Sequence, residues 1–184
     1  MLREKITIQF IQPMKKRLLF IVMLGIGLVV NAQFSKARLQ ASGLTCAMCS
    51  NAINRALQKL PFVSAVNADI KNSAFDISFK KDQEVEIEAL RKAVEDAGFF
   101  IAGLQLTGIF RELKIASEDK LRMGKNELRF LEISKQTLDG EKTIRVLNKE
   151  YVTAKEFKKL DAATRARLLQ SDKEANGKLI FVTI

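Results

Sequence analysis

The stretch that decides the fold is residues 43–53, which read GLTCAMCSNAI. Apolar and polar residues alternate just before it, over residues 37–41, and this pattern predicts a strand. Apolar residues at helical spacing follow over residues 53–60 and predict a helix, which Pro61 ends. The two cysteines of the quoted stretch therefore lie at a strand-to-helix junction.

The pattern continues beyond this junction in a regular order. Residues 66–79 alternate on both sides of a polar turn and predict a β-hairpin. Residues 87–97 have the period of a second amphipathic helix, ended by Gly98, and residues 99–106 can form another strand. Strand, helix, strand, strand, helix, strand is the order of a ferredoxin-like βαββαβ fold. We predict an α+β domain of this class over residues 33–107.

Residues 108–184 are predicted to form a second small α+β domain of unknown role, with a β-barrel carrying one helix as an alternative. A turn is expected at residues 138–141, and the domain boundary near residues 107–108. The predicted strands cover residues 109–116, 127–134, 142–147 and 179–184.

One helix is predicted in this second half, from Thr153 to Leu169. Thr153 and Glu156 have the spacing of a capping box, in which each side chain bonds to backbone at the helix start. Val152 and Phe157 are placed as a hydrophobic staple around the same helix start.

Residues 1–32 are typical of a secretory signal peptide. A basic stretch at residues 14–17 precedes an apolar run at residues 18–30, and Val30-Asn31-Ala32 fits cleavage before Gln33. The run is shorter than the roughly 20 residues of a transmembrane helix, although an uncleaved anchor is the alternative. We expect a periplasmic or extracellular protein that meets the membrane only transiently, through this segment.

The composition argues against several classes of function. The net charge of +10 falls to +6 without residues 1–32, and the basic residues are interspersed with acidic ones. With one tyrosine and no tryptophan, the chain has few platforms for stacking bases, so we expect no nucleic-acid partner. It has no histidine and no recognisable nucleophile–base pair, so we expect no enzyme.

The two cysteines, Cys46 and Cys49, are the candidate metal ligands. Free backbone N–H groups and the positive end of the helix dipole favour thiolates at a helix start. Two intervening residues let both sulfurs converge on one ion, and soft thiolate ligands suit Cu(I). A structural disulfide and a redox-active pair are alternatives. Zinc is disfavoured because a structural site usually takes four protein ligands.

Residues 34–106 resemble the heavy-metal-associated (HMA) domain family, which includes copper chaperones, modules of metal-pumping ATPases and the periplasmic mercury-binding protein. The family pattern GMTCxxC is matched except that Leu44 replaces Met. The segment of residues 97–99, AGF, matches the place where the family often has Gly-Tyr after the second helix. The resemblance implies Cu(I), or Hg(II) or another soft metal, on the two cysteines. The residues expected around the ion are Thr45, Met48 and Phe99.

These observations predict an exported carrier that delivers Cu(I) through Cys46 and Cys49. Its partners would be metal-donor or metal-acceptor proteins, membrane transporters among them. Two other functions are compatible with the same residues. One is a periplasmic thiol–disulfide oxidoreductase that uses both cysteines, and the other is a metal-sensing or docking module of a membrane efflux system.

Overall fold

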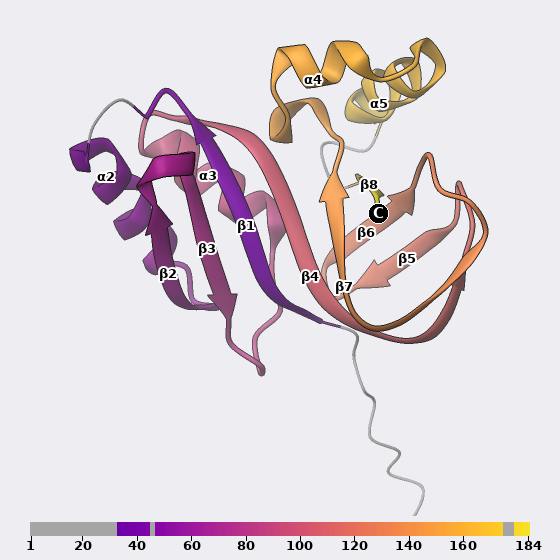
Figure 1. Cartoon of the computed structure of the whole chain (residues 1–184), viewed down its shortest axis with the longest axis horizontal. Helices are drawn as coiled ribbons and strands as arrows, with labels where there is room; N and C mark the ends of the chain where they lie inside the picture. The colour runs from indigo at the N-terminus through magenta and orange to yellow at the C-terminus, as the bar shows by residue number, and fades with distance from the viewer. Residues whose placement is uncertain (1–32, 45–46, 175–178) are drawn as a thin grey trace, which may run out of the picture. The chain divides into compact units, whose positions relative to one another are not determined.

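A computed structural model describes residues 33–44, 47–174 and 179–184. These residues form one sheet of eight strands in the order β2-β3-β1-β4-β7-β8-β6-β5 (Figure 1). The predicted signal peptide, residues 1–32, lies outside the described part of the chain. Among the described helices, none combines the length and apolar character needed to cross a membrane.

The first half has the predicted βαββαβ order. Its elements are β1 (Phe34–Ser42), α2 (Ala47–Gln58), β2 (Val63–Asp69), the short 3-10 helix η1 (Ile70–Asn72), β3 (Ala74–Phe79), α3 (Ile87–Asp96) and the first part of β4 (Phe100–Ile115). The neighbouring strands β2, β3, β1 and β4 are antiparallel. Both helices contribute to a core with the sheet, in which Leu39, Leu57 and Leu90 are fully buried. The ferredoxin-like fold predicted for this half is confirmed.

The second half extends the same sheet. Its elements are β5 (Lys120–Met123), β6 (Asn126–Phe130), β7 (Gln136–Val146), the 3-10 helix η2 (Lys149–Tyr151), α4 (Ala154–Lys159), α5 (Ala162–Glu174) and β8 (Leu179–Thr183). β7 pairs with β4 along most of its length, and β8 lies parallel to β6. The sheet has open edges at β2 and β5, so an extended sheet replaces the β-barrel considered from the sequence.

The long strand β4 joins the two halves and runs across the predicted boundary. Residues 99–106 and 109–116 were predicted as two strands, but one strand runs through residues 107–108. Gly108 is needed there for close approach, because a Cβ would lie 3.2 Å from the carbonyl oxygen of Gln33 and 3.3 Å from Met123 Cε. Gly108 thus lies where segments of the chain come close together, whereas in the sequence it marks the expected boundary between two abutting domains.

The predicted turn at residues 138–141 is also wrong, because these residues lie inside β7. The local irregularity that they mark is a bulge between β4 and β7. Gly140 has a φ of 73°, Glu112 of the opposite strand has a φ of 44°, and the register shifts between Phe110 and Leu113. The backbone N–H of Glu112 donates to Asp139 Oδ1 at 3.3 Å. These residues therefore bend a strand pair without reversing the chain.

The single helix predicted from Thr153 to Leu169 is divided into α4 and α5. Thr153 Oγ1 accepts a hydrogen bond from the Glu156 N–H at 3.2 Å, as expected of the capping box. Asp161 then begins a second helix, because its Oδ1 accepts from the N–H groups of Ala163 and Thr164 at 2.9 and 3.0 Å. An aspartate that competes for these donors favours a new helix start over continuation.

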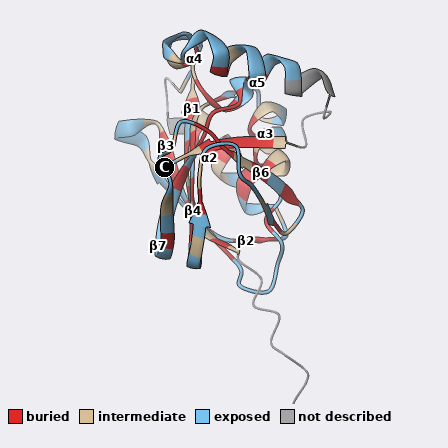
Figure 2. Cartoon of the chain, turned by 90° about the vertical axis from the view of Figure 1, so that its right-hand side faces the viewer, coloured by how far each residue is buried: buried red, intermediate tan, exposed pale blue. Residues whose placement is uncertain are grey.

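Buried residues, drawn in red in Figure 2, occur along the sheet in both halves of the chain. The main core includes Leu39 and Leu57 of the first half and Phe130 and Ile180 of the second. A smaller core lies between β6, β8 and the two last helices, and contains Leu131, Leu147, Val152, Phe157, Leu168 and Phe181. Independent folding of residues 33–107 stays a prediction, since shared packing does not measure the stability of either half alone.

Candidate metal-binding loop

The loop between β1 and α2 is where the sequence places the metal. Cys49 lies in the first turn of α2 and is half-buried, while Met48 beside it is 84% exposed. Thr45 and Cys46 fall outside the described residues, so the convergence of the two thiols stays a prediction. The first turn of α2 contains no acidic residue. Local carboxylates therefore do not offset the positive end of its helix dipole.

Helix α2 is anchored by the side that faces the core. Ser50, Ile53 and Leu57 are buried at helical spacing. Leu44, which stands where the family has methionine, is half-buried and packs against the same core. These contacts determine where the helix begins relative to the sheet, and so they position Cys49 at the end of β1.

Phe99 lies at the base of the loop, as expected from the resemblance. Gly43 has a φ of 82°, which favours glycine, and a Cβ built on it would lie 4.0 Å from Phe99 Cδ1. The ring of Phe99 also packs against the main core. The Phe99 ring thus lies near the start of the loop, whereas its influence on a bound ion stays a prediction.

The backbone at the C-terminal end of α3 places Phe99 near the start of the metal-binding loop. Gly98 has a φ of 88°, and its N–H donates to the Glu95 carbonyl oxygen at 2.8 Å. The Phe99 N–H donates to the Val94 carbonyl oxygen at 3.1 Å. These bonds satisfy carbonyl groups at the helix end and direct the chain into β4 beside the loop.

Three large apolar side chains are exposed at this end of the sheet, and we call them the apolar rim: Met48, Ile70 and Phe100. Their exposed fractions are 84%, 63% and 68%. Phe100 is paired with Ser42, the last residue of β1. The turn that follows Ile70 is tied to the same strand, because the Ala41 N–H donates to the Ser73 carbonyl oxygen at 3.0 Å.

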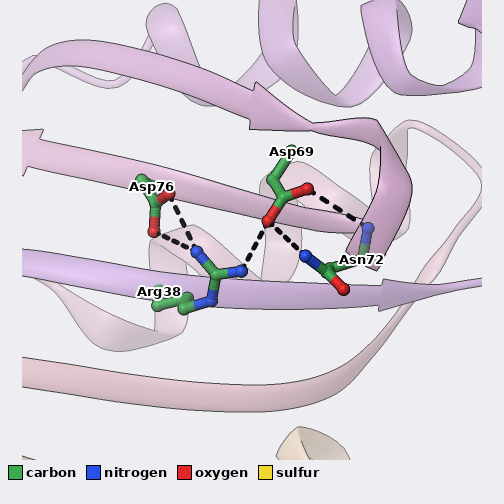
Figure 3. Close-up of polar contacts among 4 residues, drawn as sticks. All are labelled: Arg38, Asp69, Asn72 and Asp76. Atoms are coloured by element: carbon green, nitrogen blue, oxygen red, sulfur yellow. Dashed lines mark hydrogen bonds and ion pairs between the residues drawn. The ribbon is translucent and has the colours of Figure 1, made fainter.

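A polar network braces the strand that leads into the loop (Figure 3). Arg38 Nη1 donates to both carboxylate oxygens of Asp76, at 2.7 and 2.9 Å, and Nη2 donates to Asp69 Oδ2 at 2.7 Å. Hydrogen bonds from Asn72, and then from Arg38, lower the pKa of Asp69. The network connects β1, β3 and the end of β2, on the side of β1 opposite to buried Leu39.

Two contacts from the second half reach α3, and sequence reasoning missed both. Asn126, the first residue of β6, bonds to the backbone at the start of α3. Tyr151 is buried, and its hydroxyl donates to Glu88 Oε2 at 3.1 Å. The hydrogen bond from Arg91, and then its charge, lower the pKa of Glu88. No local sequence pattern predicts these two contacts, because Asn126 is 39 positions from Ile87 and Tyr151 is 63 positions from Glu88.

Comparisons with known proteins agree with this geometry. The heavy-metal-associated domain family matches residues 38–100. Copper chaperone CopZ of Bacillus subtilis is 33% identical over 64 residues, which cover 35% of this chain and 91% of CopZ. The mercuric transport protein periplasmic component of Serratia marcescens is 29% identical over 86 residues, covering 47% of this chain and 93% of that protein.

Two further similar proteins match a part of this chain of similar length. A probable copper-transporting ATPase of Arabidopsis thaliana, HMA5, is 31% identical over 70 residues, 38% of this chain but 7% of the ATPase. This chain therefore corresponds to a small part of that relative. The solved structure of oxidized MerP from Ralstonia metallidurans is 26% identical, with a TM-score of 0.35, and covers 38% of this chain and 94% of MerP.

The βαββαβ order and a loop with cysteines at the start of the first helix define a metal-binding ferredoxin-like domain. The chain belongs to the heavy-metal-associated domain family through residues 38–100. That match ends before the second half, which the family does not account for.

Proposed function

We propose that this chain is an exported carrier of Cu(I), held by the thiolates of Cys46 and Cys49 and passed on to a partner protein. The observation that carries the proposal is the position of Cys49, half-buried in the first turn of α2 on a heavy-metal-associated fold. The similarity to a copper chaperone and to a periplasmic mercury transport protein supports a soft metal as cargo.

The donor set fits Cu(I) better than a harder ion. The chain contains no histidine, so the strong soft donors are the two thiolates. Two thiolates support a near-linear, two-coordinate Cu(I) site. Hg(II), which also prefers thiolates, would occupy the same site. Within the described residues, no three His, Cys, Asp or Glu side chains gather in a way that could hold a metal ion.

Transfer would proceed by ligand exchange without a change in oxidation state. A thiolate or thioether of the partner attacks the bound Cu(I), and one cysteine is displaced at a time. The apolar rim supports contact with a protein partner, because exposed apolar side chains around a site are typical of interaction surfaces. Metal-donor and metal-acceptor proteins, including the soluble domains of membrane transporters, are the partners that this chemistry suits.

Export is proposed from the sequence of residues 1–32. In an oxidising compartment the same cysteines can form a disulfide, which would suit the alternative function of a thiol–disulfide oxidoreductase. The two functions differ in what they require. A carrier needs tight metal binding by the reduced pair, whereas an oxidoreductase needs an oxidising disulfide and activity on a reduced protein.

Metal competition tests the proposal directly. The chain without residues 1–32 is reduced and offered Cu(I), Zn(II) and Hg(II) anaerobically, and the bound metals are then analysed. We expect one soft ion per chain, and Cu(I) to exclude Zn(II). Preferential zinc binding would overturn the proposal. So would weak metal binding together with disulfide exchange on a reduced protein substrate.

A further inference from the structure

Helix α3 is held at its first turn by the second half of the chain. Asn126 is buried, and its Oδ1 accepts from the Ile87 N–H at 3.2 Å. Its Nδ2 donates to the carbonyl oxygens of Val85 and Met123, at 2.7 and 3.2 Å. Glu86, at the position where a helix usually supplies its own cap, makes no capping hydrogen bond through its side chain. A residue distant in the sequence therefore performs this task.

The other end of the same helix supports the metal loop. The chain leaves α3 at Gly98 and brings the Phe99 ring near Gly43, where a Cβ built on the glycine would lie 4.0 Å from Phe99 Cδ1. Between the two ends, Ile87, Leu90 and Val94 are fully buried, so the helix is packed on the sheet along its length. A packed helix of ten residues moves as one element, so a displacement of its first turn also displaces its last turn.

A second contact from the same half supports α3 along its side. The buried hydroxyl of Tyr151 donates to Glu88, whose carboxylate also pairs with Arg91. Arg91 Nη1 in turn donates to Glu95 Oε1 at 2.5 Å, one turn before Gly98. These side chains form a row along the helix, from the second half of the chain toward the metal loop.

We infer that Asn126 is a positioning residue for the metal site, and that it acts through α3 and Phe99. The inference rests on the proposed function of the loop. It assigns to the second half a part in metal binding, although this half contributes no ligand. Loss of the Asn126 cap should shift the Phe99 ring relative to Gly43 and thereby weaken the metal complex.

The test compares two buried asparagines in the full chain without residues 1–32. Asn126→Ala removes the cap of α3. Asn148→Ala is the matched control, because Asn148 Oδ1 accepts from the Phe181 N–H at 2.7 Å and its Nδ2 donates to the Leu179 carbonyl oxygen at 3.0 Å. Both changes remove hydrogen bonds between a buried side chain and backbone groups. None of the side-chain hydrogen bonds of Asn148 given above involves α3.

Two readouts separate positioning from general destabilisation. In metal-free protein, the NMR shift of the Gly43 amide reports the nearby Phe99 ring, and it should change in Asn126→Ala but not in Asn148→Ala. Cu(I) competition should show roughly fivefold weaker binding in Asn126→Ala only, the ratio equivalent to about 1 kcal/mol for one capping bond. Equal affinities of the two variants, or an unchanged Gly43 signal, would overturn the inference.

A conservative variant and a double mutant complete the test. Asn126→Asp retains the acceptor for the Ile87 N–H but puts a carboxylate oxygen where the amide donates to Val85 and Met123. It should therefore weaken Cu(I) binding in the same direction as the alanine variant, and it replaces that variant should it fail to fold. In a Phe99→Leu background, Asn126→Ala should have little further effect. A full effect there would contradict action through Phe99. If the original chain binds no Cu(I), the proposed function fails, while the Gly43 signal still tests the positioning role.

Discussion

The side chain of Asn126 accepts a hydrogen bond from the backbone N–H of Ile87, 3.2 Å away and 39 positions earlier in the chain. Its amide group also donates to the Val85 carbonyl oxygen at 2.7 Å. The first residue of β6 therefore caps a helix of the ferredoxin-like half. The two halves are connected by polar contacts as well as by strand β4.

Removal of this cap should cost measurable stability. We expect Asn126→Ala to lower the free energy of unfolding by about 1–3 kcal/mol, because buried backbone groups lose their partners. Urea denaturation with an unchanged slope provides the measurement. Glu86→Ala is the control at the helix's own cap position, and its effect should stay within about 0.5 kcal/mol. Similar losses in the two variants would show that Asn126 is not the functional cap.

Both thiols should be required for metal binding. Cys46→Ser and Cys49→Ser should each abolish high-affinity Cu(I) binding. The affinity should fall by more than the roughly 10–100-fold that is typical when a residue that only hydrogen-bonds to a metal ligand is replaced. The fold should remain nearly intact, which circular dichroism checks. Met48→Leu is the matched control in the same helical turn, and a small effect is expected because Met48 is largely exposed. Unchanged affinity in either cysteine variant would place the site elsewhere.

The start of α5 should make stability depend on pH in the acid range. Hydrogen bonds from the side chain and backbone of Thr164 lower the pKa of Asp161 from 3.8 to about 2. A lowered pKa in the folded state means that this stabilisation is fully present above the ordinary value and is lost as the pH falls toward 2. Asp161→Asn keeps a capping oxygen but cannot ionise. The stability difference between the original chain and this variant should therefore shrink between about pH 5 and pH 2, and a constant difference would refute the assignment.

The fragment of residues 33–107 should fold and bind Cu(I) by itself. It contains both helices of the βαββαβ unit and every strand pair among β1, β2 and β3. It lacks Asn126 and Tyr151, so its melting temperature should be lower than that of the longer chain. Cu(I) should raise this temperature, because a ligand that binds only the folded state stabilises it. A fragment that folds only when residues 108–184 are added would show that the halves form one folding unit.

The exported protein should begin at or near Gln33. Mass spectrometry of material secreted by an exporting host measures the N-terminal residue directly. The expectation comes from the basic stretch, the apolar run and Val30-Asn31-Ala32. A chain that retains residues 18–30 would indicate a membrane anchor instead.

The sequence by itself determined the first half because its signals are local. Alternating residues predicted β1, helical spacing predicted α2 and α3, and each pattern reports which side of an element is buried. The position of Cys49 at the start of α2 followed from the same reasoning. A capping box likewise indicated the start of α4, since both of its residues lie within one turn.

Tertiary structure decided what depends on partners distant in the chain. Gly108 reads as a boundary in the sequence, and only its closeness to Gln33 and Met123 shows that it lies inside a strand. No local pattern in the sequence assigns a role to Asn126, and only the folded chain brings it to the first turn of α3. Periodicity reports the burial of a side chain but does not name the segment that buries it. The strand shared by the two halves and the cap of α3 were therefore visible only in three dimensions.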